Sequence, residues 1–406
     1  MNILLTIAWR NIWRHPARSG ILIAAIVAGT WAGIVTAGWT NGLVGQRVEY
    51  LIGTELSHAQ IHHPEFRLER EVWMTIPDAL DILVCLDGHP KVHSISPRTL
   101  AFGLAMSPVT TSGVQIRGVD PLKERATTTF HERIVDGSWF EDEARNPVII
   151  GRRLSDRLGL GIGNRLVLQF QDLDNQITAG AFHITGIFKS ASADYDERNV
   201  IVRDRDLYKL IAEQPVWHEI AISLMDRDDA ESLVAEINEQ FPDVHAQTWF
   251  QLSPEVRYMT DWSGIITLLL MAIIMMALSF GILNTMLMAI FERKRELGML
   301  LSIGMGRSRV FNMIMLESLM LTLGGASAGM ALSYLTLQYL SKKGIDMSLF
   351  SDGLAEFGFD PVTYPFVTAG ELAGVAVIVI IAALLAALWP AIKVVRLNPV
   401  EASKDA

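Results

Sequence analysis

Four long apolar stretches constrain this chain more than any other feature of its sequence. They lie near residues 21–39, 265–290, 310–340 and 372–389. None of them has Lys, Arg or Asp at its centre. A helix needs about 20 mostly apolar residues to cross the hydrocarbon core of a bilayer, so each stretch predicts a membrane-spanning helix. The first is longer than the roughly 7–15 residues of a secretory signal's apolar region, so we expect an uncleaved anchor.

The basic residues predict the direction of these helices, because short cytoplasmic flanks carry an excess of Lys and Arg. The basic residues of the flanks are Arg10, Arg14, Arg18, Arg293, Lys294, Arg295, Arg307, Arg309, Lys393, Arg396 and Lys404. They precede the first span, separate the second from the third and follow the fourth. We therefore expect both termini and the middle connection in the cytoplasm, and residues 45–261 on the other side.

Composition agrees with a chain divided between membrane and water. The mean hydropathy is +0.30 and the formal net charge is −10. Between residues 45 and 261, Asp and Glu outnumber Lys and Arg. The negative charge therefore belongs to the exported segment, and we expect no nucleic-acid partner.

The exported segment has the size of an ordinary globular domain and alternates strand and helix signals, which predicts an α+β fold. Helical patterns cover residues 77–86, 152–158, 207–212 and 230–241. Strand patterns cover residues 114–119, 148–150, 166–170, 182–188, 200–202, 219–224 and 244–248.

Small residues recur every four positions in two of the spans. In the first span they are Ala25, Gly29, Gly33 and Ala37. Gly325 and Gly329 repeat the pattern in the third. Small side chains in one line let another helix approach closely, which predicts a helix-packing face; the alternative is that small residues are simply common in membrane helices.

The segment before the first span is rich in aromatic and basic residues. Trp9 and Trp13 stand beside Arg10 and Arg14, which predicts a short amphipathic helix in the membrane interface. The alternative is a frayed N-terminus.

Several patterns imitate catalytic or metal sites. Gly325 to Gly329 spell G-x-S-x-G, but a nucleophile elbow needs a strand-to-helix turn, and this one falls inside an apolar helix. His58, His62 and His63 could suggest a metal, but His62 and His63 point to opposite faces if this segment is a strand, so we interpret the histidines as a solvated strand edge rather than zinc ligands. The acidic pairs Asp194/Asp196 and Asp226/Asp228 lack the rest of a calcium loop, so we expect turn residues. No catalytic residue and no metal site are predicted.

The chain also lacks the means to drive transport alone. No G-x-x-x-x-G-K-[ST] phosphate loop occurs, and the expected spans hold no buried acid–base pairs for a proton relay. If the protein does work, the energy must come from a partner.

The connection between the second and third spans carries the most specific motif. It reads FERKRELGMLLSIGMGRSR from Phe291 to Arg309 and is followed by Glu317. It resembles the coupling element of FtsX-like, MacB-type ABC permeases, in which an E-R-x-x-E-[IL]-G helix, a glycine turn and a downstream glutamate sit on the ATPase. The residues carried over are Glu292, Arg293, Glu296, Gly298, Gly304 and Glu317. Leu300 and Leu301 depart from the commoner form of this motif.

The resemblance extends over nearly the whole chain. The N-terminus reads AWRNIWRHP from Ala8, and the C-terminus has Pro390, Arg396, Asn398, Pro399 and Ala402 in the family manner. Gly118-Val-Asp-Pro and Val148-Ile-Ile-Gly resemble the MacB-type periplasmic core. The resemblance implies an α-helical membrane protein with four transmembrane helices and an α+β, MacB-like periplasmic core domain.

The topology and the resemblance together predict nine segments. The helical parts are an amphipathic N-terminal helix at 1–19 and transmembrane helices at 20–44, 262–290, 310–340 and 370–390. The remaining parts are an extracytoplasmic domain at 45–261, a coupling segment at 291–309, an extracytoplasmic loop at 341–369 and a cytoplasmic tail at 391–406.

By resemblance the mechanism is mechanotransmission: ATP and Mg bind a separate ATPase subunit, and this chain, with no cofactor of its own, relays the motion to the exported domain. The chain is similar to lipoprotein-releasing, LolC/LolE-like permeases of type VII ABC systems in the bacterial inner membrane. The alternatives are a MacB-like efflux permease with a periplasmic adaptor and an FtsX-like platform that regulates an extracytoplasmic hydrolase. Expected partners are the ATPase, a second permease copy or paralogue, a lipoprotein carrier or adaptor, and membrane lipid.

Overall fold

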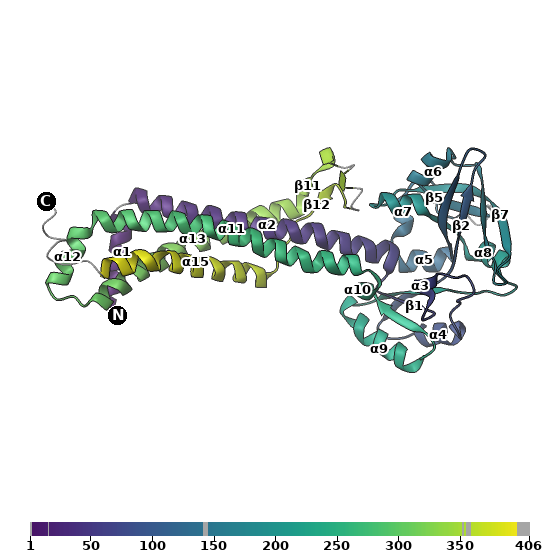
Figure 1. Ribbon diagram of the computed structural model, residues 1–406, viewed down its shortest axis with the longest axis horizontal. Coiled ribbons are helices and arrows are strands. Elements are labelled where there is room, and N and C mark those ends of the chain that lie inside the picture. The colour runs from purple at the N-terminus through teal and green to yellow at the C-terminus, as the bar shows by residue number, and fades with distance from the viewer. Residues whose placement is uncertain (1, 15, 141–144, 351–352, 355–358, 396–406) are drawn as a thin grey trace. The chain divides into compact units, whose positions relative to one another are not determined.

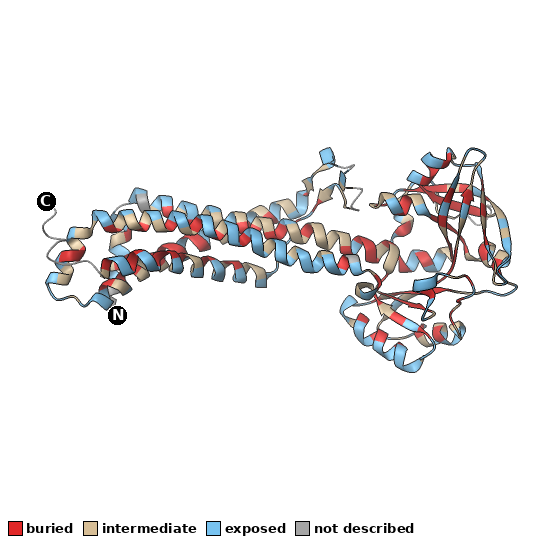
Figure 2. Ribbon diagram, viewed as in Figure 1, coloured by how far each residue is buried: buried red, intermediate tan, exposed pale blue. Residues whose placement is uncertain are grey.

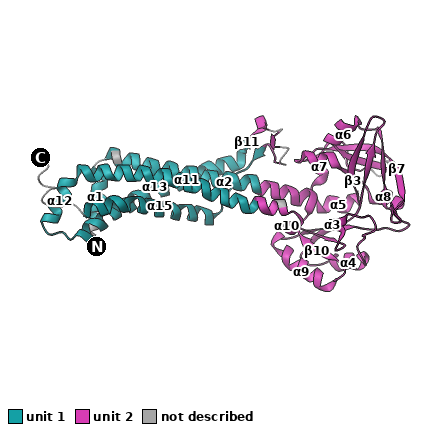
Figure 3. Ribbon diagram, in the orientation of Figure 1, with its two compact units in different colours: residues 1–44, 260–346, 362–406 teal, residues 45–259, 347–361 magenta. Residues whose placement is uncertain are grey.

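The computed structural model describes the chain except residues 1, 15, 141–144, 351–352, 355–358 and 396–406. The C-terminal motif residues Arg396, Asn398, Pro399 and Ala402, and the basic Lys404, lie outside the described residues. The chain forms two compact units (Figure 3). A helical unit contains residues 1–44, 260–346 and 362–406, and an α/β unit contains residues 45–259 and 347–361.

The helical unit is built from four long helices and two shorter ones among the described residues (Figure 1). Its helices are α1 (Asn2–Arg14), α2 (Pro16–Leu51), α11 (Pro254–Glu292), α12 (Lys294–Ser302), α13 (Arg307–Lys343) and α15 (Ala369–Val395). The last turns of α2 and the first turns of α11 belong to the α/β unit. A short antiparallel pair, β11 (Ile345–Asp346) with β12 (Val362–Thr363), connects α13 to α15. Among the described residues, four helices are long and apolar enough to cross a membrane, namely those that contain the predicted spans.

The helices pack through apolar side chains and glycines. Figure 2 shows buried residues along the faces that the helices turn towards one another, with exposed residues on the outer faces. Two glycines of α13 lie against α2: a Cβ on Gly325 would lie 2.7 Å from Ile26 Cγ2, and one on Gly329 would lie 2.7 Å from Thr30 Cβ. Gly325 and Gly329 therefore allow the backbones of α2 and α13 to approach closely.

The α/β unit is organised by one large mixed sheet. Its strands are β1 (Ala59–His62), β2 (Val92–Met106), β3 (Thr111–Val119), β4 (Ile134–Gly137), β5 (Pro147–Gly151), β6 (Arg165–Gln171), β7 (Ile177–Phe188), β8 (Asn199–Arg203), β9 (Glu219–Leu224) and β10 (His245–Thr248). The order is β10-β1-β9-β2-β3-β8-β5-β7-β4, and β6 pairs with β2 and β7. The β3–β8 and β5–β7 pairs are parallel, and the others are antiparallel.

Short helices connect the strands. They are η1 (Ile52–Leu56), α3 (Phe66–Glu69), α4 (Ala79–Leu86), α5 (Pro121–Thr127), η2 (Phe130–Arg133), α6 (Arg152–Leu158), α7 (Ala193–Arg198), α8 (Asp204–Ile211), η3 (Arg227–Asp229), α9 (Ala230–Gln240) and α10 (Trp249–Leu252). A further short turn, η4 (Ser348–Phe350), lies in the second segment of this unit.

The strand β2 passes between two hydrophobic cores. From Val92 to Arg98 it pairs with β9, whose apolar residues pack with β1, β10, α4 and α9. From Arg98 to Met106 it pairs with β3, whose apolar residues pack with β5–β8, α6 and α8. Arg98 faces Glu219 in one register and Val119 in the other, so it marks the point where β2 changes partners.

The predicted fold class is confirmed: long apolar helices accompany a mixed α/β domain, and most predicted strands and helices lie where the sequence indicated. Two interpretations were wrong. His62 does not lie on a solvated edge, because β1 is hydrogen-bonded on both sides and His62 is 3% exposed. Asp194 and Asp196 belong to the helix α7 rather than a turn, and the buried Asp196 accepts a hydrogen bond from the Ser190 amide.

Candidate functional site

The coupling segment forms the short helix α12 and a glycine turn. Arg293 occupies the position before α12, and Gly298 is buried within it. Gly304 follows with φ of +94°, a left-handed conformation that favours glycine. Its amide donates to Leu301 O at 3.1 Å, and α13 then begins after Gly306. The glycine turn predicted at Gly304 is present.

Charged side chains tie α12 to two neighbouring helices. Arg14 of α1 contacts both carboxylate oxygens of Glu296, at 3.0 and 2.8 Å. Arg293 lies 3.5 Å from Glu296, and its Nη1 lies 3.4 Å from both oxygens of Glu317 on α13. Arg293 and Glu317 are mostly buried, whereas Arg14 is exposed and Glu296 is partly exposed. The network joins α1, α12 and α13 through alternating charges.

Apolar residues of α12 pack against the neighbouring helices. Leu297 packs with Ile290 of α11, Val310 of α13 and Val394 of α15 in one buried cluster. Glu292 lies exposed at the end of α11. The structure thus brings Arg293, Glu296 and Glu317 together; the coupling role of all six motif residues stays a prediction.

The four small residues of the predicted packing face of α2 differ in whether they lie at a helix contact. A Cβ on Gly29 would overlap Leu278 of α11, and one on Gly33 would lie 2.8 Å from Met271 Sδ. Ala37 is buried and Ala25 is exposed. Three of the four positions therefore lie in or beside helix contacts of this chain.

The α/β unit buries an ionic cluster around Arg98. Its guanidinium donates to Glu124 through Nε (2.9 Å) and Nη2 (2.7 Å), and to Glu219 through Nη1. Ser96 donates to Glu124 at 2.6 Å. Burial alone would raise both carboxyl pKa values, but Arg98 overrides it: the pKa of Glu124 is lowered, and that of Glu219 is lowered to about 2. The cluster is fully charged at neutral pH.

Two buried histidines border this cluster in the neutral form. Burial lowers the pKa of His62 and of His218 to about 4, despite the nearby Glu219. His218 Nδ1 accepts from the Leu100 amide at 3.1 Å and Nε2 donates to Val72 O at 2.6 Å. Both ring nitrogens of His218 therefore take part in hydrogen bonds. Protonation of Nδ1 would prevent it from accepting the hydrogen bond of the Leu100 amide.

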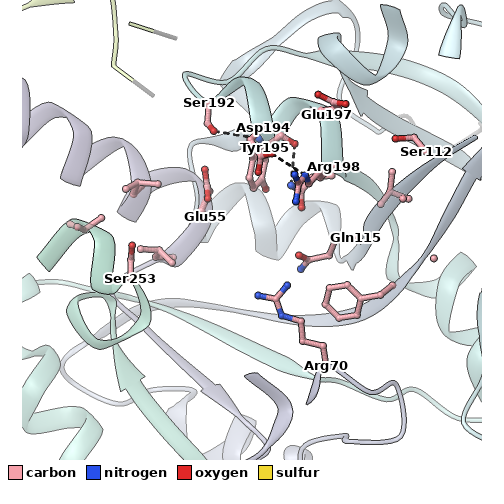
Figure 4. A pocket seen from close by; sticks show the side chains of 18 of the residues that line it. Glu55, Arg70, Ser112, Gln115, Ser192, Asp194, Tyr195, Glu197, Arg198 and Ser253 are labelled. Carbon is pink, nitrogen blue, oxygen red and sulfur yellow. Dashed lines mark hydrogen bonds and ion pairs between the residues drawn. The ribbon is translucent and has the colours of Figure 1, made fainter. Parts of the chain in front are cut away.

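A polar cleft opens beside these groups. It consists of two adjoining hollows of about 860 and 210 Å³, which we call the Tyr195 cleft. The residues shared by the two hollows are Glu55, Leu56, Arg70, Phe102, Gln115, Tyr195 and Asn199. Figure 4 shows side chains from η1, β3, α7 and the end of α3 facing the larger hollow. Burial raises the pKa of Tyr195, so the phenol stays protonated and can donate.

No group of three or more His, Cys, Asp or Glu side chains suited to a metal ion occurs within the described ranges. Ser327 of the G-x-S-x-G pattern lies in the middle of α13.

Sequence reasoning missed the Arg98 cluster and the Tyr195 cleft. A weak signal existed, since Arg98 and Glu219 are charges within or beside apolar strand patterns. Their pairing depends on which strands become neighbours, and periodicity does not give that.

Two protein families match the chain. Residues 253–399 match the family described as "FtsX-like permease C-terminal". Residues 19–240, more than half of the chain, match the family described as "MacB-like periplasmic core domain". The boundary between the two matches lies near the start of α11.

Curated relatives carry permease names. The macrolide export ATP-binding/permease protein MacB of Escherichia coli is 28% identical over 136 residues, which are 32% of this chain and 21% of MacB. The lipoprotein-releasing system transmembrane protein LolC of Neisseria meningitidis is 21% identical over 76% of this chain and 74% of LolC. The pyoverdine export ATP-binding/permease protein PvdT of Pseudomonas putida is 23% identical over 98% of this chain and 59% of PvdT. The chain thus spans about a fifth of the length of MacB.

Among solved structures, the periplasmic region of MacB from Actinobacillus actinomycetemcomitans matches 52% of this chain and 98% of its own, with 11% identity and a TM-score of 0.37.

Proposed function

This chain belongs to the FtsX-like permeases and carries a MacB-like periplasmic core domain, and on that basis we propose that it transmits the motion of a separate ABC ATPase to its extracytoplasmic domain. It is a multi-pass membrane protein with four candidate spans. ATP and Mg bind the partner subunit, and two permease chains, identical or paralogous, complete the complex.

The observation that carries this proposal is the charge network on α12. A surface helix that relays force must be coupled firmly to the helices that cross the membrane. Arg14, Glu296, Arg293 and Glu317 connect α12 to α1 and α13, while Leu297 packs into the apolar cluster shared with α11 and α15. A displacement of α12 is therefore passed to the long helices rather than absorbed by a loose loop.

Variants of the exposed ion pair test the coupling. We expect Glu296→Gln and Arg14→Gln, in the chain reconstituted with its ATPase, to separate ATP hydrolysis from substrate release. Arg10→Gln is the matched control, because Arg10 is an exposed arginine on the same helix α1. If the hydrolysis rate and release of the two pair variants match those of the control, the network has no coupling role.

The chain lies in the bacterial inner membrane with both termini and α12 in the cytoplasm. The basic residues Arg10, Arg14, Arg293 and Arg295 near α1 and α12 support this direction. Cys85 is first replaced, so that it does not react. A thiol reagent that reaches the periplasm but does not cross the inner membrane should then label Asp174→Cys in unlysed cells. The same reagent should label Ser302→Cys only after the cells are lysed. Labelling of both without lysis contradicts this topology.

The substrate is an amphiphile taken from the outer face of this membrane, with a lipid-anchored protein as the specific case. The alignment to LolC, which covers about three-quarters of both chains, supports this choice. So does the broad apolar surface of α11, where Leu268, Ile273 and Phe280 are more than half exposed. Removing an acyl chain from lipid costs about 0.8 kcal/mol per CH₂, which explains the need for ATP.

Depletion of the protein tests the substrate. Lipoproteins should accumulate in the inner-membrane fraction of the depleted cells. An unchanged lipoprotein distribution with new sensitivity to small hydrophobic toxins would instead favour efflux, the function named for MacB.

A further inference from the structure

Arg117 is a buried arginine with an unused donor at the Tyr195 cleft. It lines the smaller hollow and is 6% exposed. Its Nη1 donates to the Tyr195 hydroxyl at 3.1 Å, and its guanidinium lies 6.0 Å from the Tyr195 ring centre. In the part of the chain that the structure describes, its Nε has no hydrogen-bond partner. A buried donor without a partner is costly, so it points to a missing group.

The neighbouring Arg98 shows what such a group looks like. Arg98 uses its Nε and an adjacent Nη to hold both oxygens of Glu124, the bidentate geometry of a guanidinium and a carboxylate. Arg117 holds no carboxylate of a described residue in that way. Its Nε belongs to the same kind of donor edge, on a side chain that lines the smaller hollow.

Two further arginines surround the cleft. Arg47 lines the larger hollow, and its Nη1 is a second buried nitrogen with no hydrogen bond to a described residue. Arg70 lines both hollows, with its guanidinium 5.7 Å from the Phe102 ring centre, and Figure 4 shows it pointing towards Gln115. The positive charge therefore continues from the buried Arg117 to the mouth of the cleft.

The acidic residues of the cleft do not cancel this charge. Asp194 is paired with Arg198 at 2.9 Å, and Glu197 is paired with Arg157. Glu219, which lines the smaller hollow, is paired with Arg98. Glu55 remains, with its Oε1 unpartnered among the residues that the structure covers. Arg47, Arg70 and Arg117 therefore exceed the single carboxyl of the cleft that has no ion-pair partner among the described residues.

We propose that the Tyr195 cleft binds an acidic peptide segment, with one carboxylate side chain held by the Nε edge of Arg117 and further acidic side chains near Arg47 and Arg70. Only a carboxylate at the end of a narrow side chain can reach a residue as buried as Arg117. Aspartate and glutamate side chains have this form. The larger hollow of about 860 Å³ accommodates several residues. Gln115, Asn199 and Ser112 line it with the amides and hydroxyls that a peptide backbone needs.

The test measures peptide binding to the full-length chain in phosphatidylcholine nanodiscs, without ATPase, so that its result is independent of the coupling proposal. The probe is a fluorescein-labelled peptide of alternating glutamate and serine, followed by fluorescence anisotropy at low ionic strength. Controls are the same peptide with glutamine in place of glutamate, and citrate as a free carboxylate.

The four variants are expected to change the peptide affinity in different directions. Arg117→Gln should weaken binding about ten-fold or more, since a charge-assisted pair is lost. Arg70→Gln should weaken it less, because Arg70 is exposed. Burial raises the pKa of Glu55 to about 7, so this carboxyl is partly ionised at neutral pH, and Glu55→Gln should tighten binding most above pH 7 by removing that negative charge. Arg165→Gln, at an exposed arginine on β6 outside the cleft, should leave it unchanged.

The proposal fails if the glutamate peptide does not bind, if it binds no better than the glutamine peptide, or if citrate binds as tightly. It also fails if the Arg70→Gln and Glu55→Gln affinities equal that of Arg165→Gln. These less buried positions keep the test valid should Arg117→Gln not fold.

Discussion

The two units of this protein handle charge in opposite ways. In the helical unit, the described ion pairs lie at one connection, α12, and its Arg14 and Glu296 members reach water. The α/β unit instead buries Arg98, Glu124 and Glu219 almost completely. Apolar packing and close glycine contacts hold the helices together. The α/β unit also has apolar cores, but it contains buried charges that are tolerated only while every partner is present.

The largest expected effect comes from breaking the buried cluster. Arg98→Met leaves Glu124 and Glu219 buried without their cation, and we expect a loss of about 3–5 kcal/mol in the stability of the α/β unit. Thermal unfolding monitored by limited proteolysis measures this loss. The control is Arg152→Met, whose pair with Asp136 is about half exposed and should cost less than about 1 kcal/mol. An equal loss of stability in the two variants would show that burial does not make the Arg98 ion pairs more important for stability than the Arg152 pair.

Acid should weaken the α/β unit through its neutral histidines. The pKa of His218 is about 4 in the folded protein and about 6.5 when unfolded, so the unfolded state binds the extra proton between these values. Stability is therefore complete above about pH 6.5 and falls as the pH drops to about 4, by about 3 kcal/mol at most. Unfolding curves across this range measure the slope.

His218→Gln should reduce this pH slope, and His245→Gln, at an exposed histidine, should preserve it. An unchanged slope in the first variant would mean that other groups carry the acid sensitivity.

In the helical unit, size rather than charge should decide stability. Gly325→Leu forces a side chain against Ile26 of α2, and such overpacking costs about 1–3 kcal/mol. Gly324→Leu is the matched control, since a Cβ there meets nothing within 4 Å. The melting temperatures of the two variants, measured on the protein in detergent, compare these effects. A similar melting temperature for both would show that α2 and α13 can move apart freely.

The smallest effect concerns the turn after α12. Gly304→Ala places a side chain at φ of +94°, which should cost about 1 kcal/mol, whereas Gly306→Ala has φ of −60° and should cost little. A Cβ at either position meets nothing within 4 Å, so the comparison isolates backbone strain. The readouts are melting temperature and ATP-coupled release. Matching values would indicate that the turn relaxes into another conformation.

The sequence by itself determined the helices, the α/β class and the Gly304 turn. Span length and apolar composition are local properties, and a glycine's conformational freedom is also local, so these features follow from short windows of residues. The strands Val148–Ile150 and Glu219–Leu224 were predictable for the same reason.

Only the tertiary structure decided which charges meet. Arg98 reaches Glu219 because β2 pairs with β9, and Arg117 reaches Tyr195 because β3 lies beside β8, the strand that follows α7. These partners are 121 and 78 residues apart in sequence. Alternation along a strand specifies which face is buried, but the choice of neighbouring strand depends on the free energy of the whole packed sheet.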